Sequence, residues 1–442
     1  MKVLEACLLV ATLSAEVLPL TLQKAVAVAT AKDGNLRLQL VRESIAQAET
    51  RRRQAFSAFL PHLDGSASAA NQTRNLRAFG IQFPTVPGLN FPSFAGPFTV
   101  VDYRASASQS LLDLASIQRY KAAKALIGVA ELEAANATNL TVQQVARAYV
   151  LALQGDAGVD TAQANVELAR ALVKLADNQK NAGMGTGIDV TRARVQLANE
   201  EQRLLVAQNS RERAVLELLR VIGVDMALTV ELNDRVNDGS ELPPVLEEIL
   251  KAAQAGRQDL KAQQKRELVA GLNVQSVAAE RWPSLGVAGD YGVIGNGSDN
   301  MLPTRSVGVS LRVPIFDGAR REARRAEGGV LERQERLRAA DLAKQVELDV
   351  RLSFNNLKSA REQIATAKQG LELSENELAQ AQRRFEAGVA NSLELTDAQT
   401  RLARARDNHL NALYQFNLAR IDLAAATGGI QEAVQNMGEQ KR

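Results

Sequence analysis

The 442-residue chain lacks most of the side-chain chemistry on which enzymes depend. It has a single cysteine, Cys7, which excludes a disulfide framework and a thiolate metal site within one chain. Its two histidines, His62 and His409, are far apart in the sequence, and no nucleophile–base pair or metal-ligand spacing is found. We therefore expect no catalytic site, no cofactor and no metal, and an enzyme is the weakest functional class.

The chain also lacks a large excess of charge of one sign. Lys and Arg number 53 against 50 Asp and Glu, for a net charge of +3. A dedicated nucleic-acid binder shows a larger and more clustered excess, so we expect no nucleic-acid partner. Aromatic residues make up only 4 % of the chain, which is low for the core of a large enzyme.

Long apolar runs are missing as well. No run of about 18 apolar residues occurs, so we expect no transmembrane helix, and a membrane role would have to come from strands. Residues 1–15 resemble a weak secretory signal, because Lys2 precedes an apolar stretch that ends at Ala15. Glu5 departs from that pattern, and an ordinary amphipathic start is the alternative.

Proline is absent from two long stretches, 98–242 and 315–442, in which Ala, Leu, Glu, Gln, Arg and Lys dominate. Because proline costs about 3 kcal/mol inside a helix, these stretches are predicted to form long helices. The other segments, roughly 61–112 and 283–316, are rich in Gly, Ser, Phe and Val.

Strand alternation is clearest in the second of these segments. Between 305 and 316, apolar residues at every second position from Val307 to Ile315 alternate mostly with small or polar ones. A weaker partner strand is predicted at 285–294, with a turn at 295–298.

The first half of the chain contains a second predicted hairpin. Residues 99–112 alternate in the same way, and 63–76 is the predicted partner strand. The segment between them is rich in Pro and Phe. If the strands belong to a membrane barrel, its aromatic residues would form a girdle or plug the outer mouth of that barrel; otherwise they would simply pack the loop. These residues are Phe79, Phe83, Phe91, Phe94 and Phe98.

The two halves repeat each other at an offset of 205 residues. Ala182-Gly183 aligns with Ala387-Gly388, and Gly223 aligns with Gly428, without a gap. Each half reads as a helix, two strands and a long helical hairpin with a glycine-containing turn. The predicted segments are a first unit at 20–223 with a helical hairpin at 113–222, a linker at 224–244, a second unit at 245–429 with a hairpin at 318–427, and a tail at 430–442.

Within the predicted hairpins, large and small residues alternate in steps that average 3.5 residues. Such a seven-residue period indicates knobs-into-holes packing between helices. In the first half the pattern departs at Glu200 and Arg211, so a looser or partly wet seam is expected there, and Gly155 and Gly158 weaken the first long helix. The large seam positions in the second half are Leu395, Leu402, His409, Phe416 and Leu423.

The lengths of the predicted helices limit the possible architectures. Residues 113–180 and 318–386, if helical, each extend for about 100 Å at 1.5 Å per residue, which requires a bundle or a wall of helices. Four strands cannot close a barrel, and open strand edges are not tolerated in lipid, so membrane strands would have to be pooled from several copies. The alternative is a soluble or periplasmic coiled-coil scaffold without transport activity, which leaves the strand hairpins unexplained.

Together these features resemble the TolC-like outer-membrane efflux protein family over about residues 20–429. Each motif is weak alone, but the turn motifs are specific because they are duplicated at a fixed offset beside heptads. The motifs are Leu-Thr-Leu at 20–22, Leu-Pro-x-Leu at 60–63, Pro-Ile-Phe-Asp-Gly at 314–318 and the turns at 182–191 and 387–396.

The resemblance implies a mainly α fold with a membrane β-barrel portion. Three copies would close a twelve-stranded barrel that continues as a long α-helical tunnel across the periplasm. The protein would be a passive outer-membrane exit duct of a tripartite efflux or type I secretion system, for small molecules, drugs, metal ions or polypeptide. Its partners would be two further copies, outer-membrane lipid, a periplasmic adaptor and an inner-membrane pump of the RND or ABC type.

The resemblance also places the functional tip at the two turns, where the tunnel narrows and meets the adaptor. Asp189, Glu394 and Asp397 match acidic positions at the gate, and threefold symmetry would turn each carboxylate into a ring that attracts cations. For Asp189 the alternative is an acid in the first turn of a helix, where the helix dipole favours it. The residues expected to contact the adaptor are Gly183, Gly185, Thr186, Gly187, Gly388, Asn391 and Ser392.

The arginine and tyrosine that latch the gate in the family are not matched. Ala390 and either Gln179 or Lys180 stand at those positions, although Phe385 keeps an aromatic side chain at the second site. The latch is therefore not carried over to this chain. The glycines of 183–187 resemble a phosphate-binding loop only superficially, because no Lys-Ser/Thr follows, and a helix-to-helix turn is favoured.

Overall fold

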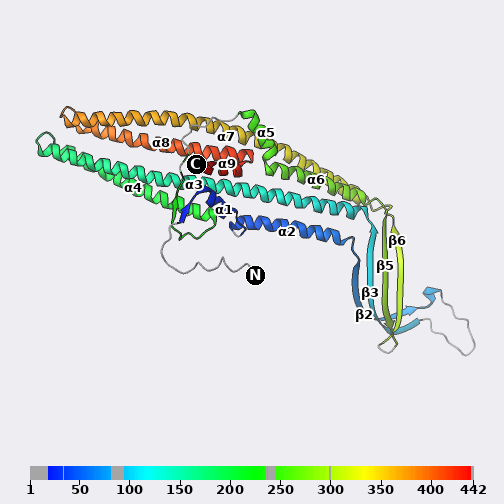
Figure 1. The fold of residues 1–442 in the computed structure, drawn as a ribbon. Coiled ribbons are helices and arrows are strands. Elements are labelled where there is room, and N and C mark those ends of the chain that lie inside the picture. The colour runs from blue at the N-terminus through cyan, green and yellow to red at the C-terminus, as the bar shows by residue number, and fades with distance from the viewer. Residues whose placement is uncertain are drawn as a thin grey trace, which may run out of the picture. The chain divides into compact units, whose positions relative to one another are not determined.

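A computed structural model describes residues 18–32, 34–80, 94–234, 236, 245–297 and 300–439, so the predicted signal at 1–15 lies outside it. The described residues are mainly helical (Figure 1). The chain forms two compact units. The sheet unit comprises Ile45–Ala130 and Gln263–Arg338, and the helix unit comprises Met1–Ser44, Glu131–Ala262 and Ala339–Arg442.

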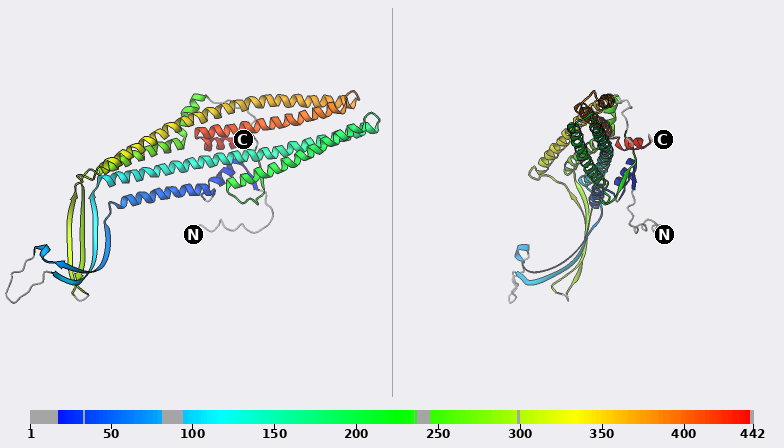
Figure 2. Two further views of the ribbon diagram at one scale, coloured as in Figure 1. Left: turned by 180° about the vertical axis from the view of Figure 1, so that it is seen from behind. Right: turned by 90° about the vertical axis from the view of Figure 1, so that its left-hand side faces the viewer.

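The sheet unit contains four antiparallel strands in the order β2-β3-β5-β6, which curve along their length (Figure 2). One hairpin comes from each half of the chain, and the pairing of β3 with β5 joins the halves at the centre of the sheet. The strands are β2 (His62–Asn75), β3 (Phe94–Leu112), β5 (Ser284–Gly295) and β6 (Leu302–Arg312).

The predicted strand at 305–316 extends too far. β6 ends at Arg312, because Pro314 has no backbone N–H with which to continue a ladder. Gly318 and Ala319 then adopt positive φ angles of 70° and 64° at the turn into the next helix. β3 in turn begins at Phe94, earlier than the predicted start at residue 99.

Two helical hairpins with glycine-containing turns reflect the internal duplication. One pairs α3 (Leu114–Asn181) with α4 (Gly187–Ile222), and the other pairs α7 (Arg320–Glu386) with α8 (Ser392–Thr427). The shorter helices are α1 (Leu22–Thr30), α2 (Leu36–Ser57), α5 (Leu246–Gly256), α6 (Gln258–Ala279) and α9 (Ile430–Glu439), and a 3-10 turn covers Arg77–Phe79. None of the helices in the described ranges is both long and apolar enough to cross a membrane.

The heptad residues of α8 lie between α8 and α7. Leu395 and Leu402 belong to one buried cluster with α7 residues, and Phe416 and Leu423 belong to another. His409 lies between these clusters and is only half-buried. Its Nδ1 atom is buried and has no hydrogen-bond partner among the described residues.

The returning helix of the first hairpin, α4, contains a buried carboxylate instead. Glu200 is 1 % exposed and accepts hydrogen bonds from Gln196 at 2.8 Å and Arg203 at 3.2 Å. Farther along, a Cβ atom on Gly155 would lie 3.0 Å from the Cα atom of Arg211. The glycine therefore lets α4 approach α3 closely at that level.

Two elements were missed in segments predicted to be irregular. The segment 224–244, predicted as a linker, contains β4 (Val230–Leu232), which pairs in parallel with β1 (Leu18–Leu20). The segment 430–442, predicted as a tail, contains α9, which inserts Ile430 and Val434 into the apolar core of the helix unit. β4 and α9 are thus parts of the folded unit.

Candidate functional site

The turn between α3 and α4 is built from a glycine cap and a capping box. Gly183 has a positive φ of 78°, which ends α3 in the left-handed conformation that glycine adopts without strain. Thr186 caps α4, and the carboxylate of Asp189 accepts hydrogen bonds from the Thr186 backbone N at 2.9 Å and from Oγ1 at 2.5 Å. Asp189 therefore lies in the first turn of α4, as the alternative interpretation expected, and is the acidic member of a capping box.

The turn between α7 and α8 follows the same plan. Gly388 has a φ of 71°, and the side chain of Asn391 accepts a hydrogen bond from the Glu394 backbone N at 3.0 Å. At the offset of 205 residues, Asn391 corresponds to Thr186 and Glu394 to Asp189. The two caps thus occupy equivalent positions in the repeat but bond in opposite senses, because Asp189 accepts from Thr186 whereas Asn391 accepts from the backbone of Glu394.

The acidic residues of the second turn are paired with arginines of their own hairpin. The carboxylate of Glu394 lies 2.9 Å from Arg384. Asp397 lies 2.6 Å from Arg401, which also contacts Glu377 at 2.9 Å. These pairs are exposed, so each contributes at most about 1 kcal/mol to stability.

The two turns lie at the same end of the helix unit (Figure 2). Polar bonds join them to each other. The hydroxyl of Ser392 donates to Asp189 and accepts from Arg192 at 3.2 Å. The amide of Gln179 donates to the backbone oxygens of Phe385 at 3.0 Å and Glu386 at 3.3 Å. Ser392 and Gln179 are 5 % and 6 % exposed, so these bonds lie between the two turns, where they are shielded from water.

Hydrogen bonds within and between the two turns favour the ionised form of Asp189. Hydrogen bonds from Ser392 and Thr186 lower the pKa of Asp189 below its ordinary value, and they outweigh the opposing effect of burial. The positive charge of Arg192 acts in the same direction.

The structure brings only some of the predicted tip residues together. Asp189, Thr186 and Ser392 form one bonded group, whereas Glu394 and Asp397 each bind an arginine separately. The roles of Gln179 and Arg192 were missed. Gln179 is one of two residues that align with a latch position of the family, and its partners are backbone oxygens, which no residue motif reveals.

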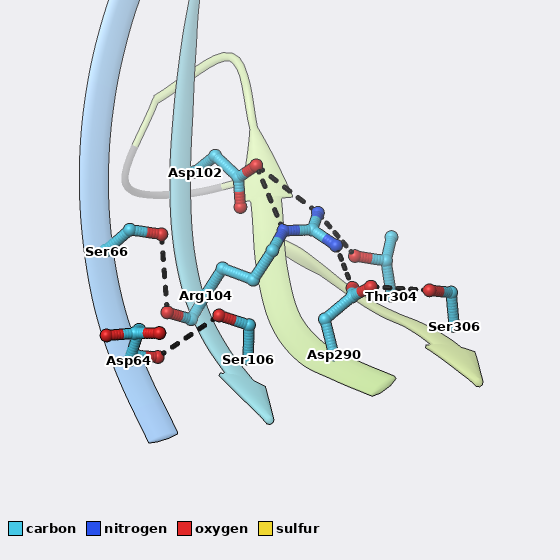
Figure 3. Close-up of polar contacts among 8 residues, drawn as sticks. All are labelled: Asp64, Ser66, Asp102, Arg104, Ser106, Asp290, Thr304 and Ser306. Carbon is cyan, nitrogen blue, oxygen red and sulfur yellow. Dashed lines mark hydrogen bonds and ion pairs between the residues drawn. The ribbon is translucent and has the colours of Figure 1, made fainter. Parts of the chain in front are cut away.

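The sheet unit presents a second polar group, on one face of the sheet. Arg104 of β3 forms ion pairs with Asp102 on its own strand and with Asp290 on β5 (Figure 3). Its guanidinium also donates to Thr304 of β6 at 3.3 Å, and Ser306 donates to Asp290. The network therefore crosses three strands of the sheet.

The opposite face of the same sheet is apolar and exposed. Val307 and Val309 of β6 are 82 % and 70 % exposed, and Leu63 of β2 is 76 % exposed. Tyr103 and Tyr291 lie on this face near the turn between β5 and β6 and are also exposed. A single copy thus leaves both faces of the sheet uncovered.

Within the described ranges, no cluster of three or more His, Cys, Asp or Glu side chains is arranged to hold a metal ion. The chemistry on offer at the turns and on the sheet is therefore charge and hydrogen bonding.

Comparisons with known proteins agree with this architecture. Residues 27–224 and 249–429 match the family described as outer membrane efflux protein. The chain is 23 % identical over 300 residues to the outer membrane protein TolC of Vibrio cholerae, covering 66 % of this chain and 68 % of that protein. It is 24 % identical over 336 residues to the alkaline protease secretion protein AprF of Pseudomonas aeruginosa, covering 74 % of this chain and 69 % of that protein.

The solved structure of CusC has the same fold, with a TM-score of 0.80 at 17 % identity over 92 % of each chain. The chain therefore belongs to the outer membrane efflux protein family, whose members are outer-membrane channels rather than enzymes.

Proposed function

We propose that three copies of this chain close one twelve-stranded barrel in the outer membrane and act as a passive exit duct. The main support for this proposal is the four-stranded sheet, which has an exposed apolar face and an exposed polar face. An apolar outer band and a polar lumen are typical of membrane barrels, which need about eight or more strands. Four strands cannot meet that requirement alone.

The strand order is compatible with closure by several copies. All neighbouring strands are antiparallel, and the even number of strands makes the two edges, β2 and β6, run in opposite directions. β6 of one copy would therefore pair in antiparallel fashion with β2 of the next. Such pairing would remove the open edges that lipid does not tolerate.

Aromatic residues gather at both ends of the apolar face. Tyr103 and Tyr291 lie near the β5–β6 turn, whereas Trp282 and Phe316 flank the other ends of β5 and β6 and are 63 % and 84 % exposed. Rings at both borders of an apolar band are typical of the two membrane–water interfaces. Of the aromatic loop residues predicted as a girdle, Phe83 and Phe91 lie outside the described residues, while Phe94 and Phe98 lie in β3.

In this proposal the long helices form a periplasmic tunnel, and the two turns form its narrow end. Asp189, Glu394 and Asp397 would each occur three times around the pore and attract cations. The bonds from Gln179 to Phe385 and from Ser392 to Asp189 would hold the narrow end together. The exposed parts of the turns would meet a periplasmic adaptor, and an inner-membrane pump of the RND or ABC type would deliver the cargo.

The cargo class is inferred from the relatives. AprF is described by its role in secreting an alkaline protease, which is a polypeptide. TolC, a second relative, is described only as an outer membrane protein. We infer that this chain conducts polypeptide or small molecules, and that the pump rather than the duct selects among them.

The test is oligomeric state combined with conductance. Protein extracted from outer-membrane fractions should migrate at trimer size on a gel before heating and at monomer size after heating. The same material should give discrete conductance steps in a planar bilayer. A monomer that inserts into no bilayer would contradict the proposal.

A further inference from the structure

Basic side chains accumulate where the strands of the sheet unit meet its helices. The four junction segments contain eleven Lys or Arg residues against six Asp or Glu residues. This excess is larger than the net charge of +3 of the whole chain, so the rest of the chain is slightly acidic. The segments are 49–60, 113–125, 277–283 and 315–327.

Most acids in these segments already have an arginine partner. The contacts are Arg321 with Asp317 at 2.8 Å, Arg324 with Glu280 at 2.8 Å, Arg281 with Glu322 at 2.8 Å, and Arg119 with Asp113 at 3.5 Å. Their pairing leaves other cations of the junction without a carboxylate. Arg51, Arg53, Arg320 and Arg325, which we call the arginine belt, are exposed and form no ion pair with any described residue.

Large apolar side chains lie beside the arginine belt. Ile315 and Phe316, which precede α7, are 91 % and 84 % exposed, and Trp282 is 63 % exposed. On α2, Phe56 lies one turn after Arg53 and is 45 % exposed, and its ring is 5.8 Å from the ring of Tyr120. Exposed aromatic and aliphatic groups next to arginine are unfavourable against bulk water but suit a membrane interface.

We propose that the arginine belt binds the phosphate groups of anionic phospholipids in the leaflet from which the helices emerge. This inference rests on the proposed function, because it assumes that the apolar sheet face lies in the membrane. Guanidinium groups bind phosphate through paired, charge-assisted hydrogen bonds. Each basic residue close to an anionic membrane surface raises the affinity for that surface about fivefold. The belt would set the depth of the sheet in the bilayer.

The test measures lipid preference on the full-length protein. Native mass spectrometry would count phosphatidylglycerol and phosphatidylcholine molecules that remain bound after transfer from a mixed micelle into neutral detergent. We expect wild type to retain more phosphatidylglycerol than phosphatidylcholine. In the Arg51→Gln, Arg53→Gln, Arg320→Gln, Arg325→Gln variant, the ratio of the two bound lipids should fall about tenfold or more. The same four positions changed to Lys should retain most of it, because the charge is kept.

A matched control removes four exposed cations elsewhere. The control changes Lys174, Arg213, Lys344 and Lys358 to Gln, all on helices of the helix unit. It should keep the wild-type preference. If the four-glutamine variant fails to fold, the Arg320→Gln, Arg325→Gln double variant and a salt titration of wild type replace it, since screening by salt should weaken the preference.

Several outcomes would overturn the inference. One is a belt variant with unchanged lipid preference, and another is a wild-type preference that salt does not affect. A belt variant with normal lipid preference but altered ion selectivity would place these arginines in the lumen instead. Conductance is recorded in parallel for wild type in neutral bilayers, so that a failure of the channel proposal is distinguished from a failure of the lipid proposal.

Discussion

The side-chain amide of Gln179, near the end of α3, donates a hydrogen bond to the backbone oxygen of Phe385, near the end of α7, at 3.0 Å. The last carbonyl groups of a helix have no donor within the helix. The Phe385 oxygen also accepts from the Gly388 backbone N at 3.0 Å, so Gln179 adds a second donor there and supplies one to the Glu386 oxygen at 3.3 Å. Gln179 is 6 % exposed, which shields the bond from water. The two hairpins therefore cannot separate at their turns without exposing or breaking this contact.

Replacing Gln179 with Ala should loosen the narrow end of the duct. The change removes hydrogen bonds to the backbone oxygens of Phe385 and Glu386, each of which contributes about 0.5–1.5 kcal/mol. We expect higher conductance in planar bilayers and a lower melting temperature. Lys180→Ala, at an adjacent exposed position, should change neither quantity. Equal effects of the two substitutions would show that Gln179 has no special role.

The contact between Ser392 and Asp189 predicts a dependence on pH. The pKa of Asp189 is lowered below its ordinary value of 3.8, so the bond stabilises the ionised form. The stabilisation is fully present above 3.8 and is lost as the pH falls through the lowered value. Conductance should therefore rise only in strong acid for wild type, and Asp189→Asn should show the raised level at neutral pH.

The control for the acid response is Asp177→Asn. Asp177 contacts Arg194 at 3.6 Å within the first hairpin, and no bond joins it to the described residues of the second hairpin. Its replacement should leave the pH profile unchanged. An acid response that persists in Asp189→Asn would assign the titration to another group.

Removing the two acids of the second turn should shift ion selectivity. In the Glu394→Ala, Asp397→Ala variant, Arg384 and Arg401 lose their nearest carboxylates at the turn, so the local charge becomes more positive. Reversal potentials across a salt gradient should move toward anions. The matched control is Glu372→Ala with Glu375→Ala, which removes two exposed acids earlier on α7. An identical shift in the control would place the selectivity outside the turn.

Two glycines of α3 should respond in opposite directions to alanine. A Cβ atom at Gly155 would lie 3.0 Å from the Arg211 Cα atom, so Gly155→Ala should cost about 1–3 kcal/mol through overpacking. No described atom outside the surrounding backbone of α3 lies within 4 Å of a Cβ atom at Gly158, so Gly158→Ala should stabilise the helix by about 0.5–1 kcal/mol. Melting temperatures of the two variants decide the matter. Destabilisation by both would indicate that α3 tolerates no added side chain here.

The elements that sequence predicts well are those with a long, regular pattern. Stretches without proline became α3, α4, α7 and α8, and alternation located the four strands of the sheet. β1 and β4 have three residues each, too few to show any period, and their pairing depends on the core around them. The strand prediction through Ile315 failed because apolar alternation continued past the proline that ends hydrogen bonding.

The contacts at the turns were less accessible to sequence reasoning. The offset of 205 residues located both turns, because each turn depends on a short local run of residues. The bonds from Gln179 to Phe385 and from Ser392 to Asp189 join residues about two hundred positions apart, and they form only once the hairpins pack. One bond ends on a backbone oxygen, which carries no signal in the residue types.

The most direct test of the central claim asks whether the edge strands of different copies pair. In a Cys7→Ser background, Ser66→Cys on β2 is combined in turn with cysteine at Thr304, Ser306, Gly308 and Ser310 on β6, all on the polar face of the sheet. Oxidation of membranes should cross-link one of these pairs between copies, because disulfides form at the spacing of adjacent strands, and the ladder on a gel should stop at three chains. Chains that remain single under oxidation at every position would contradict the account.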